Sequence, residues 1–121
     1  PMRLVLASLL LVSASSASQP ASLAGKWQVF LSVSGYESTL DCTFTQEGQE
    51  MKGKCTSDNG SVEVKGKVEE KNVHWTFTSE SGGEKHDVIM KGAVESETKI
   101  KGTVDVPSYG VTGDFTATRK E

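Results

Sequence analysis

The sequence is poor in metal ligands and in runs of like charge. Its two cysteines and two histidines are too few to suggest a metal centre. Lys and Glu are scattered singly, at a net charge of −3, which argues against a nucleic-acid or anionic-membrane surface. Short Gly-containing stretches such as "GVTG" precede no helix and carry no Lys-Ser/Thr pair, so they do not predict a phosphate loop. We expect no metal, no cofactor, no nucleic-acid partner and no enzyme activity.

Apolar runs long enough to cross a membrane are also lacking. Arg3 precedes an apolar run over residues 4–12 and small residues through Ser18, the layout of a secretory signal peptide. That run is far shorter than the roughly 20 residues of a membrane-spanning helix. We expect a signal peptide over 1–17, a linker over 18–25, and one domain over 26–121 in a secreted or periplasmic protein without a membrane span. Retention of 1–17 as a hydrophobic arm is the alternative.

Helical periodicity is missing after Leu23, and period-2 alternation takes its place. The alternation predicts an all-β domain with strands near 26–33, 38–46, 50–57, 61–69, 72–79, 84–94, 97–105 and 110–118. The short connections favour an antiparallel up-and-down meander of about eight strands. We expect a closed barrel, because closure removes exposed strand edges, with a β-sandwich as the alternative.

One pattern, apolar-x-Gly-x-apolar, recurs along these strands. It occurs as "MKGKC", "VKGKV", "MKGAV" and "IKGTV", and more loosely as "VTGDF". Alternation places the apolar residues and the glycines on the inward face and the lysines outside. Inward glycines have two explanations: they allow strands to bend tightly, or they leave a cavity for an apolar guest.

The two cysteines set a register. Cys42 opposite Cys55 places Phe44 opposite Gly53 and both sulfurs on the inward face. An exported chain favours a disulfide, so we expect a structural cross-strand bond here and not a redox-active pair.

The alternation that places residues on the inward face, together with the loop positions of tyrosines, also identifies candidate ligand contacts. The candidate interior residues are Trp27, Trp75, Phe77 and Phe115. The candidate rim residues are Tyr36, His86 and Tyr109. Thr98 shares the inward parity of His86 and would be a further polar group in an otherwise apolar interior. Periodicity alone does not give His86 the nucleophile or carboxylate that catalysis needs.

Several of these stretches carry a family resemblance. "AGKW" at 24–27 resembles the start of the first strand in calycins, the lipocalin and avidin-type barrels, and "VHWTFTSES" at 73–81 and "DFTATR" at 114–119 are similar to avidin-type strands. Val29 and Val33 stand near the places of avidin's biotin contacts, so no biotin-binding residue carries over. The whole mature chain is most similar to a secreted bacterial β-domain found alone or attached to exported hydrolases. The resemblance implies a small barrel and leaves the function open.

Two function classes follow. The first is an exported, non-catalytic barrel that binds a small hydrophobic ligand. The second is a structural or protein-interaction module with a filled barrel, which contacts a partner or its own copies. Phe30 and Ile89, large apolar residues with outward parity, would serve such a contact.

Overall fold

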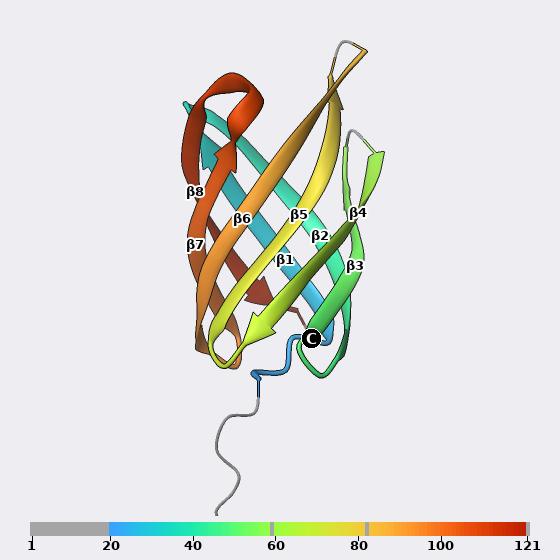
Figure 1. Ribbon diagram of the computed structural model, residues 1–121, viewed down its shortest axis with the longest axis vertical. Helices are drawn as coiled ribbons and strands as arrows, with labels where there is room; N and C mark the ends of the chain where they lie inside the picture. The colour runs from blue at the N-terminus through green and yellow to red at the C-terminus, as the bar shows by residue number, and fades with distance from the viewer. Residues whose placement is uncertain (1–19, 59, 82, 121) are drawn as a thin grey trace, which may run out of the picture.

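The computed structural model describes residues 20–58, 60–81 and 83–120, which form a closed antiparallel barrel (Figure 1). Its strands are β1 (Gly25–Val33), β2 (Tyr36–Glu47), β3 (Glu50–Ser57), β4 (Gly60–Glu69), β5 (Asn72–Ser81), β6 (Glu84–Ser96), β7 (Lys99–Val106) and β8 (Val111–Arg119). Strands pair in chain order, and β8 closes the barrel on β1. The predicted all-β meander and its closure into a barrel are confirmed. The signal peptide expected over 1–17 lies outside the described residues.

The barrel has two distinct ends. The turns β1–β2, β3–β4 and β5–β6 and the short 3₁₀ helix η2 (Pro107–Tyr109) lie at the upper end in Figure 1. The other turns and residues 20–24 lie at the lower end. The described part of the chain contains no helix long and apolar enough to span a bilayer.

Strand bounds differ from the expected ones by at most two residues. One difference changes an assignment: β7 begins at Lys99 and not at 97, so Thr98 lies exposed in the β6–β7 turn. The expectation that Thr98 points inward is wrong, because its backbone amide bonds the Ser96 hydroxyl in that turn, outside the strand alternation.

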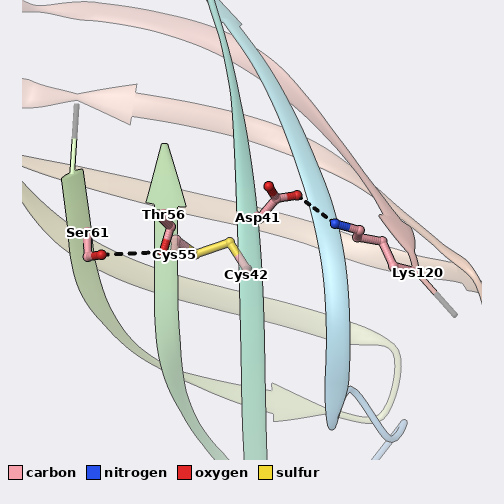
Figure 2. Close-up of a disulfide and its surroundings, with 6 residues drawn as sticks. All are labelled: Asp41, Cys42, Cys55, Thr56, Ser61 and Lys120. Atoms are coloured by element: carbon pink, nitrogen blue, oxygen red, sulfur yellow. Dashed lines mark hydrogen bonds and ion pairs between the residues drawn. A yellow bond between two sulfur atoms is a disulfide. The ribbon is translucent and has the colours of Figure 1, made fainter. Parts of the chain in front are cut away.

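The cysteine register is as expected. Cys42 faces Cys55 and Phe44 faces Gly53 across β2 and β3, and the two cysteines form a disulfide with a Cα–Cα distance of 4.0 Å (Figure 2). Both cysteines are buried. The bond therefore ties β2 to β3 from inside the barrel.

The repeated glycines mark close strand approaches. A Cβ atom on Gly66 would lie 2.7 Å from the Cα of Trp75, and one on Gly113 would lie 2.8 Å from the Cα of Val33. Real Cβ atoms do not approach backbone this closely, so any side chain would push the neighbouring strand away. These glycines permit tight coiling, and the space that a side chain would fill is already taken by the next strand.

The closure between β4 and β5 is incomplete. Their pairing runs only from Glu69 opposite Asn72 to Lys65 opposite Thr76, although both strands continue to their upper turns. The stretches 60–64 and 77–81 thus diverge, and the tops of the β3–β4 and β5–β6 hairpins stand apart in Figure 1. Closure was expected to remove exposed edges, but this split, which we call the β4–β5 split, retains two.

Candidate functional site

The lower end of the barrel is sealed by the segment 21–24. Leu23 is fully buried, and its carbonyl accepts a 2.9 Å hydrogen bond from the Trp27 indole nitrogen. Gln46 accepts a bond from the Leu23 amide at 2.7 Å and donates one to the Ala21 carbonyl at 2.8 Å. Part of the region expected to be a linker therefore packs as a plug.

Arg119 fixes the same plug from the last strand. Its guanidinium stacks 4.5 Å from the centroid of Trp27 and donates to the carbonyls of Ala24 at 2.8 Å and Ser22 at 2.9 Å. A cation over an aromatic face and two carbonyl contacts hold the backbone of the segment in place. The described residues 21–24 therefore cover the interior at this end.

The exposure of inward side chains rises slightly toward the upper end. Along β1, Trp27 and Val29 are 0% exposed, whereas Leu31 is 8% and Val33 is 9% exposed. The same rise occurs along β7, from Val104 at 0% to Val106 at 9%. The core is therefore covered less completely at its upper end.

Aliphatic side chains and one aromatic ring line this upper half. Its inward residues include Leu31, Leu40, Val62, Phe77, Val88 and Val106. Ser38 and Ser79, half-buried on the same face, add hydroxyl groups near the rim. The lining is a mostly apolar surface with a few polar groups at one end, as in many small-molecule sites.

The lower half, in contrast, is filled by aromatic rings. Trp75 packs between Phe44 and Phe115, at ring-centroid distances of 5.2 Å and 5.3 Å. All three are nearly fully buried, as is Trp27. The rings contact one another at ordinary packing distances.

His86 joins β6 to η2 at the rim. It is the one buried polar or charged side chain of the described residues, at 7% exposure. Its Nδ1 is hydrogen-bonded to the Ser108 hydroxyl at 2.8 Å and its Nε2 to the Tyr109 hydroxyl at 2.7 Å. Both ring nitrogens have partners, so burial leaves neither unsatisfied. We call this cluster of His86, Ser108 and Tyr109 the η2 latch.

The η2 latch differs from a hydrolytic triad. A triad places a carboxylate on the imidazole nitrogen that faces away from the serine. Here Tyr109 bonds that nitrogen, and the Glu84 carboxylate lies 3.8 Å from it, beyond hydrogen-bond length. The geometry favours a structural contact that holds η2 against β6.

The candidate site residues thus separate into groups. Trp27, Trp75 and Phe115 lie in the packed lower half, and Phe77 lies above them, half-buried, in the upper half. His86 and Tyr109 meet at the rim. Tyr36 begins β2 at the same end and is 63% exposed, and the hydrogen bonds and ring contact of the η2 latch do not include it. Their roles in binding remain predictions.

Sequence reasoning missed the plug and the β4–β5 split. Leu23 precedes the alternation and resembles a linker residue, and only its tertiary contacts identify it as buried. Nothing in the alternation of β4 or β5 marks where their pairing stops.

An open groove of about 600 Å³ lies on the outer wall at the base of the β4–β5 split. A row of outward side chains crosses it on four neighbouring strands: Thr45, Lys52, Lys65 and Thr76. Val64 and Phe77, the first residues above the last β4–β5 pair, also line it. A second outer groove, of about 560 Å³, has no apolar side chain in its lining, and its Lys120 forms a 2.9 Å ion pair with Asp41 (Figure 2).

Comparisons with known proteins identify similar folds. No family model matches the chain, and no curated protein matches it. Among solved structures, the redesigned beta barrel b11L5F_LGL has a TM-score of 0.69 and 26% sequence identity, covering 88% of this chain and 100% of that one. Two further redesigned barrels, mFAP1 and mFAP0, each solved with DFHBI bound, have TM-scores of 0.62 and 0.59. Their identities are 21% and 23%; the matches cover 80% of this chain and 94% and 98% of theirs.

Proposed function

We propose that this protein is an exported, non-catalytic barrel that binds one small apolar or aromatic molecule in the upper half of its interior. The observation that carries the proposal is the contrast between the two halves. The lower half is filled by rings and plugged by Leu23, whereas the upper half is lined by aliphatic side chains and Phe77, several of which are 8 to 9% exposed or half-buried. Apolar concave surfaces with few polar groups favour such ligands.

The similar barrels add limited support. mFAP1 and mFAP0 were solved with DFHBI bound, so a barrel of this kind accommodates a small molecule. At their level of identity the likeness extends to the fold, so the proposal depends on the lining of this chain. The calycin relationship and the secreted bacterial context remain part of the proposal, supported by the "GKW" start of β1.

Export and the absence of catalysis have separate support. The Cys42–Cys55 disulfide is compatible with an extracellular or periplasmic location, where such bonds persist. The η2 latch favours a non-catalytic role, because Tyr109 bonds the nitrogen of His86 that a triad carboxylate would need.

A fluorescence titration with N-phenyl-1-naphthylamine, a neutral aromatic probe, tests the proposal. Val88→Trp fills the upper interior from β6 and should lower probe affinity at least about tenfold, equivalent to ~1.4 kcal/mol. Ile89→Trp, the adjacent outward residue, is the matched control and should leave affinity unchanged. Ser79→Trp at the rim provides a second blocking variant. Saturable binding that survives both blocking variants would place the site elsewhere, and no binding to the wild type would refute the proposal.

The structural or interaction module is less favoured. Phe30, 43% exposed on β1, and Ile89, half-buried on β6, were the candidates for a subunit contact. Strands β7 and β8 separate β1 from β6 on that side of the barrel, so the two residues do not form one patch.

A further inference from the structure

The groove at the β4–β5 split has an unusual charge arrangement. Lys52 on β3 and Lys65 on β4 are direct cross-strand partners on the outer face. Like charges placed directly opposite destabilise a sheet. Among the described residues, neither lysine forms an ion pair. An anion between the two ammonium groups would relieve their repulsion.

The surroundings of the two lysines suit an anionic group. Thr45 lies opposite Lys52, and Thr76 lies opposite Lys65, so a hydroxyl flanks each cation. Glu63 also lines the groove, but its cross-strand partner is Lys54, whose charge opposes it. The Thr45 hydroxyl donates to the Lys52 carbonyl at 3.4 Å. The row therefore presents two cations and the Thr76 hydroxyl donor toward one groove.

One partly exposed aromatic side chain, Phe77, lies directly above this row. Val64 and Phe77 would be the next pair of the ladder after Lys65 and Thr76, but the strands have already diverged. Phe77 is half-buried and lines both the groove and the upper interior. A molecule whose charged end lies on the lysines would thus reach an aromatic face through the β4–β5 split.

We propose that the β4–β5 split binds an anionic amphiphile, an apolar or aromatic body that carries a carboxylate or sulfonate. Lys52 and Lys65 bind the acid group, and Phe77 contacts the body. This inference deepens the proposed interior binding, on which its apolar half rests, and adds the acid group and its site to the ligand. The second outer groove also contains Lys26 and Lys54, and no printed ion pair of the described residues involves either, but no apolar side chain lines it that could contact the body.

Two probes that differ by one sulfonate test this proposal. 1-Anilinonaphthalene-8-sulfonate is expected to bind the wild type more tightly than neutral N-phenyl-1-naphthylamine, with an affinity that falls as salt is added. Lys52→Gln/Lys65→Gln should weaken the sulfonate about tenfold and leave the neutral probe unchanged. Lys91→Gln/Lys101→Gln removes the same charge from β6 and β7 and should change neither affinity. Phe77→Ala should weaken the sulfonate as well.

The outcomes separate this inference from the proposed function. If both probes bind equally and the Lys52/Lys65 variant changes neither, the anion site is refuted while interior binding stands. If Lys91→Gln/Lys101→Gln lowers the sulfonate affinity equally, the loss reflects the overall charge of the protein, and the site is refuted. Unchanged sulfonate affinity in Phe77→Ala would refute the contact with the split. If neither probe binds the wild type, both proposals fail.

Discussion

At the scale of single residues, glycine and cysteine set the geometry of the barrel. The motif glycines lie where a neighbouring strand passes too close for a side chain, and the two cysteines join β2 to β3 inside the wall. The glycines of the apolar-x-Gly-x-apolar motif, for which the sequence allowed either bending or a cavity, therefore allow the strands to coil tightly. The slight exposure of inward side chains occurs elsewhere, at the upper end of the barrel.

Gly66→Ala tests the coiling argument. The added methyl group would meet the backbone of His74 and Trp75, so β4 and β5 must separate at their paired region. We expect a loss of about 1 to 3 kcal/mol in unfolding free energy, measured by urea denaturation. Lys67→Ala, the exposed neighbour, is the control and should change stability by less than about 0.5 kcal/mol. Equal stability of the two variants would contradict the argument.

Removing the disulfide should also destabilise the barrel. Cys42→Ala/Cys55→Ala opens a link across a sequence separation of 13 residues, which in the chain-entropy model contributes about 3 kcal/mol. The midpoint of urea denaturation should fall accordingly. Thr56→Ala, which removes only an exposed hydroxyl contact to Ser61 beside the bond (Figure 2), should have little effect. An unchanged midpoint in the double variant would show that the bond adds no stability.

At the scale of elements, strand pairing could be predicted from the sequence where a local feature marks it. The opposition of Cys42 and Cys55 predicted the β2–β3 register, and the short connections predicted the antiparallel order. The β4–β5 split could not be predicted, since the alternation in "VEVKGKVE" and "VHWTFTSES" continues unchanged through it. Divergence depends on the stagger and coiling of the whole sheet.

The candidate site was predicted unevenly for the same reason. Parity placed His86 and Phe77 inward and turn residues placed Tyr109 at the rim, as the structure has them. The contact between His86 and Tyr109 depends on how η2 folds back onto β6. The plug depends on contacts from Gln46 and Arg119, which are far from Leu23 in the sequence. Sequence patterns report which face a residue occupies, but not what meets it there.

Amide hydrogen exchange tests the β4–β5 split. In a hairpin with a two-residue turn, the two residues that flank the turn form a hydrogen-bonded pair. Along each strand, successive backbone amides then point alternately toward the hairpin partner and toward the neighbour on the other side. The amides of Ser61, Glu63 and Thr78 therefore point into the split. We expect these amides to exchange fast. Those of Val62 and Val64, which bond β3, should exchange slowly. Equal protection of all five amides would contradict the divergence of β4 and β5.

At the scale of the whole molecule, the two ends of the barrel differ, and the lower end is the one covered by the plug. The plug and the aromatic layer close the lower end, the η2 latch holds part of the upper rim, and the β4–β5 split opens the wall between them. This asymmetry explains why a filled lower core and a less completely covered upper interior exist in one small domain. A ligand that binds here would stabilise the fold by mass action.

The most direct test of the central claim is a methyl carbon–proton NMR titration of the wild-type protein with N-phenyl-1-naphthylamine. The account predicts saturable shifts for the methyl groups of Leu31, Leu40 and Val88, in the upper half, and none for those of Val29 and Ile100, in the packed lower half. Absent shifts, or saturable shifts confined to the lower half, would contradict the proposal that this barrel binds its ligand in the upper interior.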